Sequence, residues 1–224
     1  PAPGMIARVT SGPAQDEVRR LLGLIEEIDP RIRSVNAVNS HALAEAEALD
    51  DESAEGRSRS PLHGRAVLVK DNIDTAGLAS TAGSLALADA PPERDAPLVR
   101  RLREAGMVVL GKTNLSEWAN IRDLHSTSGW SAHGGLTRNP YALNRTAWGS
   151  SSGSGAAVAA RLAAFAVGTE TNGSITAPAA ACGLVGLKPG RGVVAAGESS
   201  GDPARLVAPG PLARSSEDAA LMMD

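Results

Sequence analysis

The sequence predicts an α/β fold that contains at least one parallel pair of strands. Two short apolar runs rich in valine, residues 65–70 and 106–112, are typical of strands buried on both faces of a sheet. Between them, residues 96–106 carry apolar side chains at helical spacing and end in a glycine, a common helix terminator. Strand, helix and strand in this order indicate a crossover between parallel strands.

The segment before this unit is predicted to be helical and to end in a linker. Residues 14–29 carry apolar side chains at helical spacing, and residues 41–50 form a second, shorter helix. The polar stretch 50–64 is typical of an exposed loop or linker. We therefore expect two parts: an N-terminal helical segment with its linker at residues 1–60, and a core at residues 61–224.

Further elements follow the first crossover. The sequence predicts a helix over residues 154–164 and strands over residues 165–170 and 184–187. Near the end, Ser215 and the aspartate three residues later form a capping-box pattern ahead of an apolar run, which predicts a last helix. That run reaches Asp224 without a helix breaker, so we expect the chain to be a fragment or one piece of a larger protein.

The composition narrows the class of protein. Hydrophobic residues make up 42% of the chain and aromatic residues 2%, so the core must consist of Ala, Val, Leu and Ile. A net charge of -3, with acidic and basic residues interspersed, argues against a nucleic-acid or anionic-membrane partner. Cys182 is the only cysteine, which rules out an intrachain disulfide, and we expect it to be a small buried side chain. No apolar run reaches the roughly 20 residues of a membrane span, and no signal-peptide pattern is visible, although the chain begins at Pro1.

A serine-rich loop, WGSSSGSGAAVAA at residues 148–160, matches three motif templates. A flexible linker is disfavoured because strand-like and helical runs flank the loop. The dinucleotide pattern G-x-G-x-x-G/A is matched only in part, since Val158 stands where Gly or Ala belongs and no strand precedes the loop. The pattern G-x-S-x-G makes Ser151 a candidate α/β-hydrolase nucleophile. However, all four histidines precede it, whereas the histidine of that family follows its serine.

A lysine is the remaining candidate base for these serines, because Ser–Lys pairs replace Ser–His pairs in some hydrolases. The chain has three lysines, Lys70, Lys112 and Lys188, each at the end of an apolar run. Burial there would lower a lysine pKa from about 10.4 toward the range that suits a base. A lysine that reaches solvent from a strand end is the plainer interpretation and is expected for two of the three. The spacing alone does not choose among them.

A second candidate serine, Ser174, follows an Asn-Gly turn in the stretch AVGTETNGSITAPAAACGL, which is built mostly from small residues. An ordinary turn with a solvated serine is one interpretation. A nucleophile is the other, because backbone N–H groups in such bare surroundings can reach an oxyanion.

Three stretches together resemble the amidase signature family: VLVKDNIDTAG, GSSSGSGAAVAA and VGTETNGSITAPAAACGLVGLKPGRG, which stand in that family's order. The resemblance is specific from about residue 61 to residue 214, and Ser150 and Ser174 have the spacing of the family's two catalytic serines. Further stretches, KTNLSEWAN, SGWSAHGG and TRNPYALN, look most like peptide amidases, which hydrolyse C-terminal carboxamides. The resemblance implies an α/β/α sandwich with a central mixed sheet, of which this chain would form the N-terminal half.

Carried over to this sequence, the resemblance makes Ser174 the nucleophile and Lys70 the base. Ser150 becomes the serine that bridges them, on a cis peptide bond, and Ser151 would help to hold Lys70 through hydrogen bonds. The implied reaction cleaves a carboxamide to an acid and ammonia through an acyl-enzyme, with no cofactor and no metal.

The same resemblance places an oxyanion hole at Thr171, Asn172 and Gly173, together with the N–H of Ser174. The small residues around Ser174 fit this role, because the backbone there must approach the substrate carbonyl closely.

The sequence departs from the family's usual residues at five positions, which leaves the substrate open: Trp148, Ser152, Asn172, Thr176 and Val207. Family chains are also considerably longer, so we expect part of the pocket to lie in an absent C-terminal half. Two alternatives remain: an amidotransferase subunit that releases ammonia to a partner, and a diverged acyl-transferring or non-catalytic member. We expect a small-molecule or peptide amide substrate, no nucleic-acid or membrane partner, and a possible homo-oligomer. The compartment stays open, with the cytoplasm slightly favoured.

Overall fold

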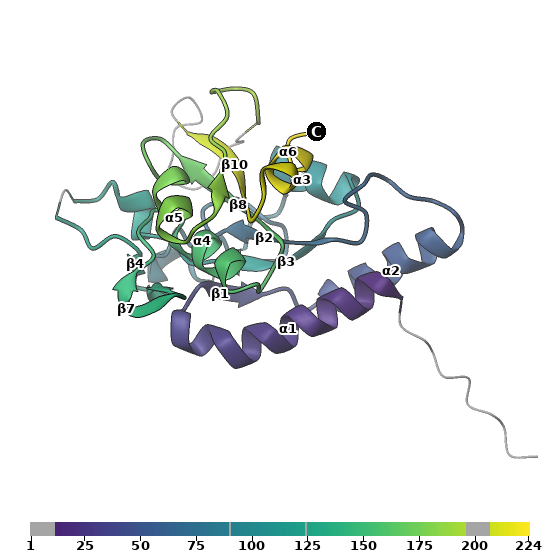
Figure 1. The fold of residues 1–224 in the computed structure, drawn as a ribbon, viewed down its shortest axis with the longest axis horizontal. Helices are drawn as coiled ribbons and strands as arrows, with labels where there is room; N and C mark the ends of the chain where they lie inside the picture. Colours follow the sequence, from purple (N-terminus) through teal and green to yellow (C-terminus); the bar gives the residue numbers. More distant parts are fainter. Residues whose placement is uncertain (1–11, 90, 124, 196–206) are drawn as a thin grey trace, which may run out of the picture.

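A mixed six-stranded sheet forms the centre of the protein in the computed structural model, which describes residues 12–89, 91–123, 125–195 and 207–224 (Figure 1). From one edge to the other the strands are β1 (Val35–Val38), β3 (Val108–Thr113), β2 (Ala66–Lys70), β8 (Phe165–Glu170), β10 (Ala208–Ala213) and β9 (Val185–Gly186). β2 lies parallel between β3 and β8, whereas β1, β10 and β9 run antiparallel to their neighbours. The predicted mixed sheet is confirmed.

Helices cover both faces of this sheet and complete three layers. On one face lie α1 (Pro13–Ile32), α2 (Ala42–Ala54) and α4 (Ser152–Ala159), and on the other lie α3 (Pro97–Glu104) and α6 (Ser216–Leu221) (Figure 1). Successive strand residues point to opposite faces. In β2, Ala66 and Leu68 join the core under α1, α2 and α4, while Val67 and Val69 join the core under α3. A short helix, α5 (Thr176–Ala181), packs beside α4 and β9.

The first predicted unit is confirmed, with β2, α3 and β3 at the expected places, and β8 spans the residues predicted for it. α4 differs from its prediction, because it begins two residues early and ends at Ala159 rather than at residue 164. It ends there because Arg161 has a left-handed backbone, with φ of 62°, which a right-handed helix cannot contain.

The N-terminal segment contains the two predicted helices and one strand that the sequence does not predict. Pro13 begins α1, where the missing proline N–H is no loss, and the left-handed Arg33 ends it. α2 continues to Ala54, four residues beyond its predicted end at residue 50. β1, between the two helices, pairs with β3 at the edge of the central sheet. The division of the chain after residue 60 stays a prediction, but the first part contributes directly to the sheet.

β10 is a second strand that the sequence does not predict. Pro209 and Pro211 lie inside it, and proline cannot donate a hydrogen bond to a neighbouring strand. The strand is nevertheless paired on both sides, with β8 and with β9. Gly210 between the two prolines leaves no room for a Cβ atom, which would contact the carbonyl oxygen of Leu187. The strand is therefore held by close approach to its neighbours.

The last helix begins as predicted and ends earlier. Ser215 Oγ accepts a hydrogen bond from the N–H of Asp218 at 3.1 Å, which confirms Ser215 as the cap of α6. The helix ends at Leu221, so the prediction that it continues to the last residue is wrong.

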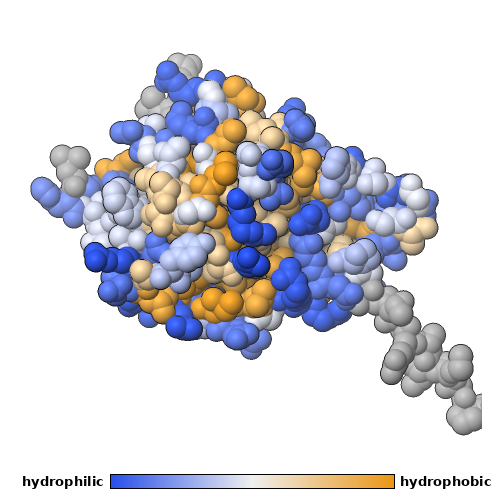
Figure 2. All heavy atoms as spheres, viewed as in Figure 1, coloured by the Kyte–Doolittle hydropathy of each residue, from blue (hydrophilic) through white to orange (hydrophobic). Residues whose placement is uncertain are grey.

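Short elements and loops form the remainder of the described chain. Two hairpins join β4 (Trp130–Ser131) to β5 (Gly135–Leu136) and β6 (Arg138–Asn139) to β7 (Ala142–Thr146), and two 3-10 turns are η1 (Leu85–Leu87) and η2 (Glu117–Asn120). Apolar residues interrupt the hydrophilic surface on the face shown in Figure 2. In the part of the chain that the structure describes, every helix is too short or too polar to cross a membrane.

Candidate active site

The candidate residues gather around a pocket at the ends of two neighbouring parallel strands. Lys70 is the last residue of β2, and Thr169 is next to last in β8, so both lie at the same edge of the sheet. The pocket has a volume of about 270 Å³. Its walls come from three loops and the end of β8: Ala119, Asn120, Ile121, Gly149, Ser150, Thr169, Thr171, Asn172 and Ser174. Two of the three predicted catalytic residues, Ser150 and Ser174, therefore border one cavity.

Lys70 lies behind this wall, with its side chain fully buried. Its Nζ donates to Ser150 Oγ at 2.8 Å, to Thr169 Oγ1 at 2.8 Å and to the carbonyl oxygen of Thr169 at 3.3 Å. Asn72 Nδ2 donates to the same Thr169 Oγ1 at 3.1 Å. The lysine amine is thus held between the hydroxyl of Ser150 and Thr169 of the neighbouring strand β8.

Ser150 stands on a cis peptide bond to Gly149, as the family resemblance implies. The carbonyl oxygen of Ser150 accepts a hydrogen bond from the N–H of Ser116 at 3.0 Å. A Cβ atom at position 149 would collide with Ser116 Oγ, so a larger residue before the serine would displace that hydroxyl.

Ser174 lies in the loop between β8 and α5, and Glu170 holds this loop in shape. The Glu170 carboxylate accepts hydrogen bonds from the N–H groups of Gly173 at 2.8 Å, Ile175 at 2.7 Å and Thr176 at 2.9 Å. Burial raises the pKa of Glu170, but the hydrogen bonds from Thr176, Ile175 and Gly173 outweigh it, and the pKa lies below its ordinary value. The Glu170 carboxylate therefore stabilises the conformation of the loop that carries Ser174.

The four predicted oxyanion donors differ in whether their N–H group already has an acceptor in the protein. The Gly173 N–H is already donated to Glu170, so it is not available to a ligand. The N–H groups of Thr171, Asn172 and Ser174 have no protein acceptor among the described residues. Three of the four predicted donors are thus unoccupied beside the pocket.

Ser151, the alternative nucleophile, is fully buried and is not among the residues that line the pocket. Its Oγ accepts the N–H of Thr169 at 3.2 Å and lies 3.3 Å from the Thr169 carbonyl oxygen. Its own N–H donates to the carbonyl oxygen of Ser174 at 3.0 Å. Ser151 is therefore hydrogen-bonded to Thr169, and Thr169 in turn accepts hydrogen bonds from Lys70.

The other two lysines have different surroundings. Lys188 is exposed, as expected of a lysine at a strand end. Lys112 is instead fully buried, and its Nζ donates to Ile73 and Ser80 rather than to a residue of the pocket. The expectation that two lysines reach solvent is therefore wrong for Lys112. Burial lowers its pKa to about 8.

Thr169 and Asn72 are site residues that the sequence does not predict. Thr169 Oγ1 accepts a hydrogen bond from Lys70 Nζ, and Asn72 Nδ2 donates to the same oxygen. Both residues lie inside stretches that carry the family resemblance, VLVKDN and VGTETNG. A useful signal is the position of Thr169 at the carboxyl end of a buried strand, where parallel sheets often place ligands.

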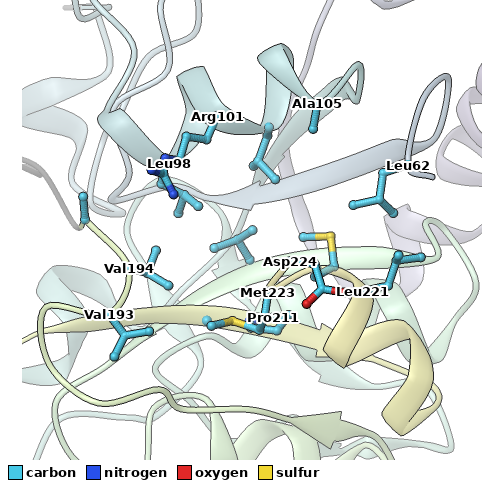
Figure 3. A pocket seen from close by; sticks show the side chains of 15 residues that line it. Leu62, Leu98, Arg101, Ala105, Val193, Val194, Pro211, Leu221, Met223 and Asp224 are labelled. Atoms are coloured by element: carbon cyan, nitrogen blue, oxygen red, sulfur yellow. The ribbon is translucent and has the colours of Figure 1, made fainter. Parts of the chain in front are cut away.

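A second pocket, of about 280 Å³, lies on the face of the sheet that α3 and α6 cover, between α3, β10 and residues 221–224 (Figure 3). Leu98 of α3 lies on one side of this pocket, and Val194 and Met223 lie on the other (Figure 3). Most of the residues that line the pocket are apolar. None of the candidate catalytic residues lines it.

Comparisons with known proteins agree with this architecture. The family model described as Amidase matches residues 16–224. The chain is similar to the native peptide amidase from Stenotrophomonas maltophilia, with a TM-score of 0.91 and 52% identity over 94% of this chain and 44% of that one. It is also similar to an amidase family protein from Bacillus anthracis, with a TM-score of 0.90 and 40% identity over 94% of this chain and 43% of that one.

Another relative is named as an amidotransferase subunit rather than as an amidase. One subunit of the glutamyl-tRNA(Gln) amidotransferase from Carboxydothermus hydrogenoformans is 42% identical over 201 residues, which cover 89% of this chain and 40% of that one. The chain therefore spans less than half the length of each of these three relatives.

Proposed function

This chain belongs to the amidase family, and from that premise we propose that its pocket is the acylation site of an amide hydrolase. The observation that supports this most directly is the contact of Lys70 Nζ with Ser150 Oγ at 2.8 Å, at the wall of a pocket that Ser174 also borders. A buried amine, a bridging hydroxyl and a second hydroxyl are the groups that a serine–lysine hydrolase requires.

In the proposed reaction, neutral Lys70 accepts a proton from Ser150 Oγ while Ser150 Oγ accepts the proton of Ser174. Ser174 Oγ attacks the amide carbon and forms a tetrahedral intermediate. The proton returns along the same path to the leaving nitrogen, the C–N bond breaks, and an ester on Ser174 remains. Water then attacks the ester carbon and gives up its proton to the same relay. The relay returns a proton to Ser174 Oγ as the ester C–O bond breaks, which releases the acid and restores the serine hydroxyl.

The negative oxygen of the tetrahedral intermediate requires hydrogen-bond donors. We assign this role to the N–H groups of Thr171, Asn172 and Ser174, which have no protein acceptor in the described part of the chain. Loss of one such donor costs about 3–4 kcal/mol of transition-state stabilisation in hydrolases where it has been removed. Glu170 keeps the loop in the shape that these donors require.

The proposed substrate is the carboxamide of a peptide. The identity of 52% with a peptide amidase exceeds the 42% with an amidotransferase component. This difference in identity favours hydrolysis of a peptide amide over transfer of ammonia to a partner.

Ammonia release by the complete protein tests the proposal, with a peptide carboxamide and free glutamine as substrates and Ser174→Ala as the matched control. We expect ammonia from the peptide carboxamide and none from the control. Ammonia from glutamine alone would favour the amidotransferase alternative. A folded protein that releases ammonia from neither substrate would contradict hydrolysis of amides of this class.

A further inference from the structure

A second lysine is buried close to the proposed site and takes no part in the proposed reaction. Lys112 of β3 lies beside Val69 of β2 in the parallel register, and its side chain is fully buried. It is not among the residues that border the pocket of Ser150 and Ser174. A buried charge is costly unless it is paired and hydrogen-bonded, so its surroundings indicate what it does.

Three oxygens surround the Lys112 amine. Nζ donates to the carbonyl oxygen of Ile73 at 2.5 Å and to Ser80 Oγ at 2.8 Å, and it lies 3.9 Å from Asp71 Oδ1. These acceptors all belong to the turn that follows β2. Burial lowers the pKa of Lys112 to about 8, and nearby carboxylates, Asp71 first among them, oppose that change. The amine is therefore held by two hydrogen bonds and an ion-pair contact to one turn.

Asp71 is the counter-charge and ties the same turn together. Asp71 Oδ2 accepts hydrogen bonds from Thr81 Oγ1 at 2.5 Å and from Asn36 Nδ2 at 2.9 Å. Asp71 Oδ1 accepts the N–H of Thr81 at 3.1 Å. Residues 71–82 thus fold back onto the end of β2, with Lys112 and Asp71 between them.

This turn begins at the residue after Lys70. It contacts the backbone of Lys70 directly and the Lys70 amine through Thr169. The N–H of Ile73 donates to the carbonyl oxygen of Lys70 at 3.0 Å. Asn72 Nδ2 donates to Thr169 Oγ1 at 3.1 Å, and that oxygen also accepts from Lys70 Nζ at 2.8 Å. A shift of the turn would therefore move the Lys70 backbone and the acceptor that orients its amine.

We propose that Lys112 is a positioning residue for Lys70. Its ammonium and the Asp71 carboxylate fix the turn 71–82, and the turn fixes the Lys70 amine through Asn72. The inference rests on the proposed function, because it takes Lys70 to be the base. An apolar residue at position 112 would fill the same space, but it could not hold the oxygens of the turn.

The test compares two variants of the complete protein, Lys112→Met and the double variant Lys112→Met/Asp71→Asn, with Lys188→Met as the exposed control. The double variant leaves no buried carboxylate without its partner, which protects the fold. We expect kcat for a peptide carboxamide to fall about 10- to 100-fold in both Lys112 variants, with little change in KM, because a displaced base acts on the transition state. Circular dichroism verifies that each variant is folded.

A merely structural role would change stability and leave the chemistry intact, so a second readout follows the chemistry itself. This readout is the pH dependence of the rate at which a fluorophosphonate labels Ser174. We expect its midpoint to shift in the folded double variant and to stay unchanged in Lys188→Met. A folded double variant with the wild-type kcat and the wild-type midpoint would overturn the positioning role. Absence of Ser174 labelling in the wild-type protein would instead count against the proposed function, so the two failures are distinguishable.

Discussion

Ser151 donates its backbone N–H to the carbonyl oxygen of Ser174 at 3.0 Å, and this bond joins the two loops that carry the proposed bridging serine and nucleophile. Because the bond is between main-chain atoms, it does not depend on the hydroxyl of Ser150 or of Ser174. Substitution of either hydroxyl should therefore leave the loops in place. Effects of such substitutions on activity can be interpreted as effects on the chemistry.

Replacement of Lys70 by alanine should reduce turnover at least about 100-fold, because a general base contributes roughly 10²- to 10⁴-fold to a rate. The Lys70 amine is the group in contact with Ser150 Oγ. Ammonia release from a peptide carboxamide by the complete protein measures the effect, and Lys188→Ala is the exposed control. An active Lys70→Ala protein, with Lys188→Ala folded but inactive, would contradict the assignment of the base.

A fluorophosphonate should label Ser174 and no other serine of the pocket. Ser174→Ala should lose the label, as read by mass spectrometry of the digested protein. Ser150→Ala should slow labelling strongly without moving it, since the relay is broken while the attacking oxygen remains. No label is expected on Ser151, because it is buried and hydrogen-bonded to Thr169. A label found there would show that the alternative nucleophile is the correct one.

Glu170→Gln should destabilise the fold by about 1–3 kcal/mol, because an amide cannot accept all the N–H groups that the carboxylate accepts. The pKa of Glu170 is lowered in the folded protein from 4.5, so its charge contributes stability above pH 4.5. That contribution is lost as the pH falls from 4.5 through the folded value. Urea unfolding in neutral and in acidic buffer measures it. A difference between wild type and variant that is as large in acid as at neutral pH would contradict this role.

Ser152→Ala should stabilise the protein by about 1 kcal/mol. Ser152 is buried at the start of α4, and its Oγ has no hydrogen-bond partner in the described residues. Alanine removes this unsatisfied group and favours the helix. Thermal unfolding should show an increase in Tm of about 2–4 °C. A decrease would mean that the hydroxyl has a stabilising partner.

Elements that depend on their own residue pattern can be predicted from the sequence, whereas elements that depend on their neighbours cannot. β8 begins with the apolar run at residues 165–167 and has the bounds that the sequence predicts. β10 contains Pro209 and Pro211, which argue against a central strand, and only its pairing with β8 and β9 makes it one. β1 is short and is fixed by its pairing with β3.

The same distinction holds at the site. The family resemblance, not the spacing alone, proposes roles for Lys70, Ser150 and Ser174. The structure places Ser150 and Ser174 at one pocket and the Lys70 amine against Ser150 Oγ, and the catalytic roles stay a proposal. No sequence pattern tells which buried lysine contacts Ser150, because Lys70 and Lys112 both follow apolar runs and differ in where their amines donate. The occupation of the Gly173 N–H by Glu170 is likewise a matter of loop geometry.

The central position of β2 beside β8 also has a consequence for folding kinetics. Lys70 and Thr169 meet across this parallel pair although they are 99 positions apart in the chain. Contacts between distant segments form slowly, because the chain must lose the entropy of a long loop before the pairing stabilises it. The lysine amine therefore reaches its acceptors only after the middle of the sheet has closed. Partly folded chains that contain only α1, α2 and the first crossover lack Thr169, so they lack an acceptor that orients the Lys70 amine.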